Sequence, residues 1–363
     1  MSEAALGDYK EIWNSESELV NRALGEFLDL KVKEGERLGA WVGQYYGNVK
    51  GYVMRGGKRL RPVLVAAGYR AVHEKVDVKY LYRAACSIEI LHNGSLLHDD
   101  LIDHDETRRG GPTFHALYRD MYKKMSKNLE KAKDFGTAMA ILGGDSLLNM
   151  GAEMIVSSEL DPKIALECIK YYQHAYHTLA EGVLLETIMT KEKDTTPEAY
   201  LEMIRMKTAV LFEDSLLMGA TIAQATQPQL DGLREFGTKV GQAFQVQDDI
   251  LGSFGDESIT GKAVDGDIKE GKKTMLVIES YRRGTPEQKK TLDEHLGRSD
   301  LAKEDVEQVK AVFKDSGALK ATQDLMRKLL TTGQKALETK PPLLPKYKRF
   351  LLDLSAFLVE RNY

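Results

Sequence analysis

Three aspartates within five positions are the first sign of chemistry in this sequence. They are Asp99, Asp100 and Asp103, in a segment that reads HDDLID. On a helix Asp99 and Asp103 lie one turn apart, where unpaired carboxylates repel each other. Their apolar neighbours make burial without a partner costly. Because Mg²⁺ prefers one or two carboxylates together with water and phosphate oxygens, the segment predicts a magnesium site for a phosphorylated substrate.

Basic residues follow these aspartates. Arg108 and Arg109 carry planar guanidinium groups that suit phosphate oxygens. Gly110, Gly111 and Pro112 come next, and we expect them to end the helix. An ordinary charged helix end with Asp–Arg pairs is the alternative. The apolar setting of the acids favours the phosphate site.

A second acidic pair, Asp248 and Asp249, stands in the segment FQVQDDILG and also has apolar neighbours. Lys262 and Lys272 follow it. Helical bundles build metal sites from facing side chains of different helices. Two acidic clusters on separate helices therefore predict a cavity with metal held between them.

Other basic residues complete a set that could handle diphosphate. Lys58 and Arg61 lie three residues apart in the segment GGKRLRP, which opens a helix. Helix starts favour anions. Lys207, followed by Thr208, stands in an otherwise apolar helix. For Lys207 the alternative is a side chain that extends its charge to solvent.

The elements that must position these residues read as helices. Apolar residues recur every three or four positions, and strand-like alternation is scarce. Thr196 and Thr285 each precede a proline, as at helix starts. No linker divides the chain, so we expect one all-α domain over residues 1–363. The lysine-rich residues 119–133 predict a solvated helix face or mobile loop, with a membrane-surface or regulatory role as the alternative.

Composition narrows the functional class. A net charge of −4 gives no general attraction to nucleic acid. Cys86 and Cys168 offer neither a disulfide framework nor a metal motif, which fits a reducing cytoplasm. We expect no signal peptide and no transmembrane segment. His174 and His177 lack an evident third zinc ligand.

Taken together, these motifs resemble the trans-isoprenyl diphosphate synthases, the family of farnesyl and geranylgeranyl diphosphate synthases. The matching segments run from Gly56 to Thr274. The resemblance implies an isoprenoid synthase-like bundle of about ten core helices around a central cavity, usually as a homodimer. It implies isopentenyl diphosphate and an allylic diphosphate as substrates, with about three Mg²⁺ ions per site as cofactor.

The resemblance also implies roles by motif position. Metal binding falls to Asp99, Asp100, Asp103, Asp248 and Asp249. The isopentenyl diphosphate pocket falls to Lys58, Arg61, His92 and Arg109. The allylic diphosphate falls to Arg108, Lys207, Thr208, Gln245 and Lys262. The groups expected to carry the catalysis itself are Asp99, Asp100, Asp103, Lys207, Asp248 and Lys262.

The sequence departs from the family pattern at two places. The usual third aspartate of the second motif is Gly252 here, as in archaeal geranylgeranyl diphosphate synthases, which makes that type the nearest match. Our hypothesis is that Asp256 compensates through a water. Where the family has a Gly-Gln pair followed by Asp, this chain has Gly182, Val183 and Glu186.

Product length should depend on the residues before Asp99. The family stops growth with aromatics four and five places earlier, where this chain has Ser95 and Gly94. Leu91 lies deeper on the same helix. We expect geranylgeranyl diphosphate, with longer products or farnesyl diphosphate as alternatives. Phenylalanine at Gly94 should then shorten the product.

The expected reaction needs no protein nucleophile. Diphosphate leaves the allylic substrate, the double bond of isopentenyl diphosphate attacks the cation, and a proton is lost. A terpene cyclase would not need Lys58, Arg61 and His92, and head-to-head synthases space their acids differently. A non-catalytic regulatory subunit of a prenyl synthase would be inactive alone.

Overall fold

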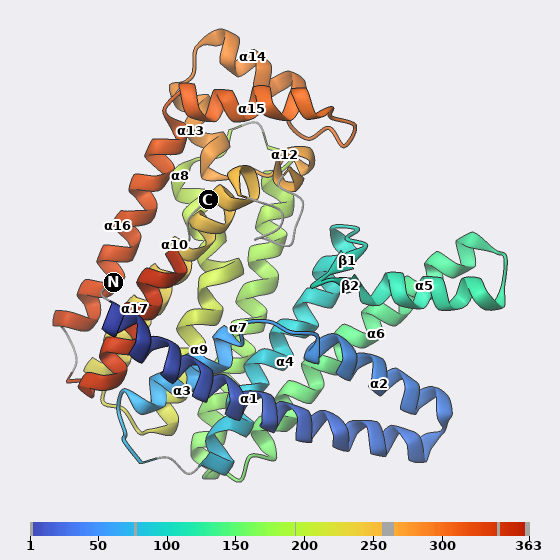
Figure 1. The fold of residues 1–363 in the computed structure, drawn as a ribbon, viewed down its shortest axis with the longest axis vertical. Coiled ribbons are helices and arrows are strands. Elements are labelled where there is room, and N and C mark those ends of the chain that lie inside the picture. The colour runs from blue at the N-terminus through green and yellow to red at the C-terminus, as the bar shows by residue number, and fades with distance from the viewer. Residues whose placement is uncertain (1–2, 76–77, 193, 256–264, 340–341, 360–363) are drawn as a thin grey trace. The chain divides into compact units, whose positions relative to one another are not determined.

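The computed structural model is almost entirely helical (Figure 1). The residues that it describes are 3–75, 78–192, 194–255, 265–339 and 342–359. Within these residues the predicted all-α fold is confirmed. The expected central cavity stays a prediction.

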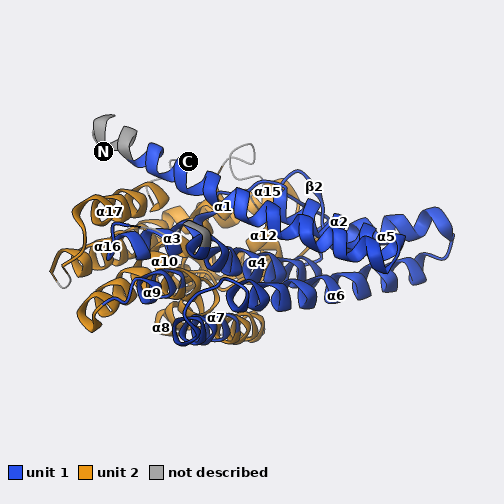
Figure 2. Ribbon diagram, turned by 90° about the horizontal axis from the view of Figure 1, so that it is seen from below, with its two compact units in different colours: residues 1–176, 215–225 blue, residues 177–214, 226–363 orange. Residues whose placement is uncertain are grey.

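The chain forms two compact units (Figure 2). Unit 1 holds residues 1–176 and 215–225, and unit 2 holds residues 177–214 and 226–363. Helices α7 (Pro162–Met189) and α9 (Val210–Ile222) contribute residues to both units. The sequence-based expectation of one domain stays a prediction.

Unit 1 is built from long helices and a short hairpin. Its elements are α1 (Glu3–Leu38), α2 (Ala40–Met54), α3 (Leu60–Arg70), α4 (Val78–Ile102), β1 (Thr107–Arg108), β2 (Gly111–Pro112), α5 (Phe114–Met125) and α6 (Leu129–Val156). Helix α4 packs against α1, α3 and α6. Three of its apolar residues, Leu81, Ile88 and Leu91, are at most 1% exposed. The helix that carries the first aspartates is therefore firmly held.

A buried ion pair fixes the loop before α3. Arg59 is 3% exposed and donates from Nη1 to Oε1 of Glu89 on α4, at 2.8 Å. Its Nε donates to Oδ1 of Asn21 on α1, also at 2.8 Å. A buried pair with such additional hydrogen bonds is costly to break. Arg59 thereby joins the loop that carries Lys58 to two long helices.

Unit 2 is organised around the long helix α10. Its elements besides parts of α7 and α9 are α8 (Pro197–Ile204), η1 (Arg205–Ala209), α10 (Gln227–Phe254), α12 (Gly266–Glu270), α13 (Met275–Arg283), α14 (Pro286–His295), α15 (Lys303–Asp315), α16 (Ala318–Thr339) and α17 (Pro345–Val359). Helix α10 packs along α16 and against η1. Thr196 and Thr285 cap α8 and α14, as predicted.

The lysine-rich residues 119–133 form the end of α5 and the start of α6. Lys124, Lys131 and Lys133 are exposed, and Asn128 caps α6. The expected solvated helix face is confirmed for this segment. Among the described residues, no helix has the length and apolar character needed to cross a membrane. Cys86 and Cys168 are buried and free, as expected.

Candidate active site

The first aspartates lie at the end of α4. The amide of Asp103 donates to the carbonyl of Asp99 at 2.8 Å, so the predicted one-turn spacing is confirmed. The expectation that Gly110, Gly111 and Pro112 end this helix is wrong, because α4 already ends at Ile102. The glycines instead belong to the β1–β2 hairpin.

The hairpin turn places two arginines side by side in sequence but in different surroundings. Arg108 pairs with Gly111 in the antiparallel register, and Arg109 and Gly110 form the turn. Their φ angles are 51° and 72°. Positive φ at both central residues matches the twist of a two-residue hairpin, and glycine adopts it readily. Helix-stop rules cannot distinguish this turn from a helix end.

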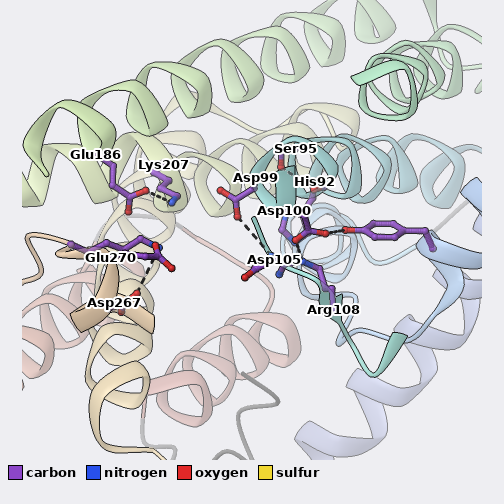
Figure 3. A network of polar contacts seen from close by, with 12 residues as sticks. His92, Ser95, Asp99, Asp100, Asp105, Arg108, Glu186, Lys207, Asp267 and Glu270 are labelled. Carbon is purple, nitrogen blue, oxygen red and sulfur yellow. Dashed lines mark hydrogen bonds and ion pairs between the residues drawn. The ribbon is translucent and has the colours of Figure 1, made fainter. Parts of the chain in front are cut away.

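Asp100 is fully buried between two partners. Its Oδ2 accepts from the hydroxyl of Tyr52 at 2.8 Å, and its Oδ1 accepts from Nε of Arg108. Burial raises the pKa of Asp100, while Arg108 opposes the shift. Arg108 also lies 3.3 Å from Asp105 and 3.9 Å from Asp99 (Figure 3). One guanidinium therefore compensates several carboxylates, and the metal role expected of Asp100 stays a prediction.

Arg55 holds the hairpin in place. Its Nη1 donates to the carbonyl of Pro112 at 2.7 Å and reaches the carbonyl of Arg108 at 3.4 Å. A Cβ at Gly111 would lie only 2.5 Å from the Arg55 guanidinium. Gly111 is therefore needed for close packing against Arg55.

Positive charge gathers around His92 on α4. Burial and the charges of Arg61, Arg109, Arg108 and Arg59 lower the pKa of His92 well below its usual value, so the imidazole is neutral at pH 7. Several cations beside a neutral donor suit an anion. Arg61 and Arg109 thus act electrostatically on His92, and the diphosphate pocket expected of these three residues stays a prediction.

The loop before α3 contributes to the same surroundings. Arg109 donates to the carbonyl of Gly56 at 3.1 Å and to Oδ1 of Asn93 at 3.4 Å. Gly57 has a φ of 114°, and a Cβ there would lie 3.1 Å from Cζ of Arg109. Lys58, the next residue, is exposed. The glycines let the backbone approach the guanidinium closely.

In unit 2, Lys207 lies on the wide helical turn η1. Its Nζ donates to Oε2 of Glu186 at 2.5 Å, and Figure 3 shows the two side chains pointing toward each other. A Cβ at Gly182 would lie 2.4 Å from the amide nitrogen of Lys207. Gly182 therefore lets α7 approach η1. Glu186, which stands where the family has an aspartate, contacts Lys207 directly.

A chain of hydrogen bonds links η1 to the second acidic pair. Thr208 donates to Oε1 of Gln245 at 2.6 Å, and Gln245 donates to Oδ1 of Asp249 at 2.8 Å. The hydroxyl of Tyr200 donates to Oδ2 of Asp249 at 2.6 Å. Three residues named from the sequence, Thr208, Gln245 and Asp249, are thus linked directly, and their expected roles stay predictions. Tyr200 was not predicted from the sequence.

The wide turn explains how Tyr200 and Thr208 both reach α10. In a regular α-helix two residues eight positions apart differ by about 80° in direction. The π-helical turn Arg205–Ala209 takes up an additional residue between them. Both side chains therefore face α10.

Negative charge is concentrated around Asp249. Burial, followed by the charge of Asp267, raises the pKa of Asp249 to about 8, and Glu186 adds to the shift. Hydrogen bonds from Tyr200 and Gln245 oppose it. Asp248, its neighbour, is half-buried. A bound cation would relieve this crowding, which is the electrostatic setting of a metal site.

The carboxylates fit a magnesium ion that keeps part of its own ligand shell. No group of three or more His, Cys, Asp or Glu side chains converges on a metal position in the part of the chain that the structure describes. Mg²⁺ needs only one or two carboxylates, since water and substrate oxygens complete its shell. In unit 1, partly exposed Asp99 and half-buried Asp103 offer such carboxylates, and in unit 2 half-buried Asp248 offers one. Two residues named from the sequence, Lys262 and Asp256, lie outside the described residues.

The proposed chain-length positions have different surroundings. A Cβ at Gly94 would lie 3.1 Å from the carbonyl oxygen of Gly144 and from Cβ of Leu147, so Gly94 faces α6. Ser95 is half-buried and donates to the carbonyl of His92 at 2.9 Å. Leu91 is fully buried. Of the two small residues, Ser95 lies one turn before Asp99 and is the better position for a probe.

The raised pKa of Asp249 predicts how pH affects stability. The pKa of Asp249 in the folded chain exceeds its ordinary value of 3.8. The contribution of this carboxyl to the free energy of unfolding is therefore fully present below pH 3.8 and is lost as pH rises toward 8. We expect Asp249→Asn to raise the melting temperature of the metal-free chain at pH 8 by about 2 °C or more. The two chains should melt alike near pH 3.8. Calorimetry across this range measures the difference.

Mg²⁺ with inorganic diphosphate provides the control for this measurement. These ligands should stabilise the wild-type chain more than the variant, since binding to the folded state adds to stability. Equal melting temperatures of the wild-type chain and the Asp249→Asn variant at pH 8 without metal would show that the charge of Asp249 does not destabilise the fold.

Comparison with known proteins agrees with this site. The sequence profile described as "Polyprenyl synthetase" matches residues 43–315. The short chain isoprenyl diphosphate synthase of Methanocaldococcus jannaschii is 36% identical, over 75% of this chain and 76% of its own. The geranylgeranyl diphosphate synthase of Saccharolobus solfataricus is 33% identical, over 85% of this chain and 87% of its own.

A solved structure supports the same assignment. The geranylgeranyl pyrophosphate synthase of Corynebacterium glutamicum, crystallised with isoprenyl diphosphate and magnesium, has a TM-score of 0.90. It is 28% identical, and the match covers 96% of this chain and 99% of that one. The resemblance to isoprenyl diphosphate synthases is thereby confirmed, and the chain belongs to the polyprenyl synthetase family of prenyltransferases.

Proposed function

We propose that this prenyltransferase condenses isopentenyl diphosphate head to tail with an allylic diphosphate, with geranylgeranyl diphosphate as its product. The observation that carries the two-substrate reaction is the positive charge around the neutral His92. A cyclase acts on one diphosphate and has no use for this second cationic set. The names of the relatives from S. solfataricus and C. glutamicum agree with the product.

The residues divide into two groups by charge. Lys58, Arg61, His92 and Arg109 hold isopentenyl diphosphate through charge-assisted hydrogen bonds. Asp99, Asp103, Asp248 and Asp249 bind the metal that accompanies the allylic diphosphate, and about three Mg²⁺ ions are expected there. When bound, Mg²⁺ stabilises the negative charge that develops on the leaving diphosphate.

Two basic residues near the allylic substrate also stabilise the negative charge of its diphosphate. Arg108 is positioned by Asp100, and Lys207 is positioned by Glu186. Their charges stabilise the departing diphosphate as the carbon–oxygen bond breaks. The double bond of isopentenyl diphosphate then forms the new carbon–carbon bond, and the proton lost from that substrate passes to the diphosphate. No protein nucleophile takes part.

Two further assignments belong to this proposal. We propose a homodimer in which a second copy covers the face of α6 that carries Ile141 and Leu142, which are 45% and 55% exposed. We also propose that residues 1–363 act as one catalytic domain, and that the enzyme works in the cytoplasm. The exposed apolar side chains support the first assignment, because apolar patches of this kind mark interaction sites.

The reaction is tested by feeding the purified chain Mg²⁺, labelled isopentenyl diphosphate and starters of five, ten or fifteen carbons. Labelled prenyl diphosphate should form, and chelation of Mg²⁺ should abolish it. Asp99→Asn should lower kcat by on the order of 10²–10³-fold, since transition-state charge is then poorly stabilised. Asp134→Asn, at an exposed aspartate of α6, is the matched control.

Two outcomes would contradict the proposed reaction. Release of diphosphate from the allylic substrate without isopentenyl diphosphate would indicate a cyclase. A folded chain without activity of its own would indicate a regulatory subunit.

Product length is tested at Ser95. On α4 this residue and Leu91 follow the face of Asp99 at four-residue spacing, and we propose that the growing prenyl chain extends along that face. Ser95→Phe should block it and shift the product toward farnesyl diphosphate. Ser95→Ala, which removes only the hydroxyl, should leave the product unchanged. Chromatography of the dephosphorylated products measures the chain length. If Ser95→Phe made a product of the same length as wild type, the assignment would be wrong.

The homodimer is tested by sedimentation. Ile141→Glu with Leu142→Glu should halve the particle mass, because charges buried without partners oppose association. Leu184→Glu, at a leucine of unit 2 that is 58% exposed, should leave the mass unchanged. A wild-type chain that sediments as a monomer would contradict the proposal.

A further inference from the structure

Arg59 adopts a backbone conformation that few residues other than glycine take. Its φ is 50°, in the left-handed region, and it stands between Lys58 and Arg61 where α3 begins. Such a conformation is unfavourable for a residue with a side chain, and it persists only where the surrounding structure holds it. The shape of the loop before α3 therefore depends on the contacts that the side chain of Arg59 makes.

Three acceptors hold the side chain of Arg59. Its Nη1 donates to Oε1 of Glu89 at 2.8 Å and to the carbonyl of Val53 at 3.0 Å. Its Nε donates to Oδ1 of Asn21 at 2.8 Å. Glu89, which is 2% exposed, is the charged acceptor among the three, and charge-assisted hydrogen bonds are about twice as strong as neutral ones. Glu89 therefore contributes most to holding this conformation.

Glu89 has a second partner on its own helix. Its Oε1 also accepts from Nδ2 of Asn93 at 3.3 Å, and Asn93 is fully buried one turn further along α4. On its other side, Oδ1 of Asn93 accepts from Nη1 of Arg109 at 3.4 Å. The same nitrogen of Arg109 donates to the carbonyl of Gly56 at 3.1 Å. One buried carboxylate is thus connected to the loop before α3 and to the hairpin arginine.

The charge of Glu89 also acts on Arg109. Burial lowers the pKa of Arg109, the charge of Glu89 opposes this shift, and the charge of Arg59 adds to it. Two guanidinium groups repel each other unless a negative charge compensates them. Glu89 therefore allows Arg59 and Arg109 to lie in the same surroundings.

We propose that Glu89 is a positioning residue for isopentenyl diphosphate. Through Arg59 it holds the loop that carries Lys58. Through Asn93 it orients Arg109. Both cations are thereby placed before the substrate binds, which lowers the cost of binding. The inference rests on the proposed function, which assigns Lys58 and Arg109 to the diphosphate of this substrate, and it adds a buried residue that acts on the substrate only through them.

The test is direct binding of isopentenyl diphosphate to the Glu89→Gln variant. Without an allylic diphosphate this substrate is not condensed, so calorimetry measures its Kd in the absence of turnover. Glu89→Gln should raise the Kd about 10-fold, which corresponds to the loss of one charge-assisted hydrogen bond to the substrate. With both substrates present, the KM for isopentenyl diphosphate should rise likewise, whereas kcat and the KM for the allylic diphosphate should stay unchanged.

Arg59→Gly is the compensating change. Glycine takes a positive φ readily, and this substitution also removes the guanidinium that Glu89→Gln leaves without a charged partner. The variant with both substitutions should therefore bind isopentenyl diphosphate more tightly than Glu89→Gln alone. A Kd that stays as high in the double variant would show that Glu89 does not act through Arg59, and it would overturn the inference.

Glu16→Gln is the matched control. Glu16 is also 2% exposed in unit 1, and its Oε1 lies 2.8 Å from Nε of Arg70, at the other end of α3. Both Glu16→Gln and Glu89→Gln should lower the melting temperature, because each breaks a buried ion pair. Only Glu89→Gln should weaken the binding of isopentenyl diphosphate. An equal loss of affinity in the two variants would reduce the role of Glu89 to stability and overturn the inference.

Asn93→Leu replaces Glu89→Gln if the latter does not fold. It keeps the pair of Arg59 and Glu89 but removes the acceptor of Arg109, so the Kd should rise about 3-fold or more. An unchanged Kd would contradict the positioning role.

The prenyl-transfer assay separates this inference from the proposed function. A wild-type chain that makes prenyl diphosphates, while the variants bind isopentenyl diphosphate as tightly as wild type, would refute only the role of Glu89. A wild-type chain that makes none would refute the proposed function and this inference with it.

Discussion

Repulsion between carboxylates is the constraint on which the described polar architecture depends. Aspartates placed one turn apart on apolar helices cannot remain charged without compensation. In unit 1 the guanidinium of Arg108 contacts Asp100 and Asp105, and the hydroxyl of Tyr52 completes the shell of Asp100. In unit 2 the ammonium of Lys207 compensates Glu186. Each unit therefore satisfies part of its negative charge internally.

The negative charge of the carboxylates in unit 2 is only partly compensated by basic side chains. Burial and the charge of Asp267 raise the pKa of Asp249, so this carboxyl would gain from a cation. Around His92 the arrangement is different, since burial and the charges of four arginines keep the imidazole neutral. Clustered carboxylates suit a metal ion, and clustered arginines suit diphosphate. This charge distribution is consistent with the two ligands of the proposed prenyl transfer.

The sequence predicts the parts of this site that depend on short-range spacing. Helical periodicity predicts the all-α fold, and the positions of Asp99 and Asp103 follow from it. Partners that come from distant segments carry no such signal: Tyr52 lies 48 residues before Asp100, and Tyr200 lies 49 residues before Asp249. Arg55 was missed because its role depends on the hairpin, which helix-stop rules do not anticipate. These contacts are set by tertiary packing, which local propensity does not encode.

The wide turn η1 makes the winding of a helix a functional property. Helices α8, η1 and α9 follow one another without a break, so the wide turn is a change of pitch inside one continuous helix. If residues 205–209 wound as a regular α-helix, Thr208 would point about 80° away from the direction of Tyr200, which would carry it away from Gln245. Losing one residue from 205–207 would restore a common direction, because seven positions of a regular helix end within about 20° of full turns. The site therefore depends on how the backbone winds at this point, although no loop or single side chain marks the constraint.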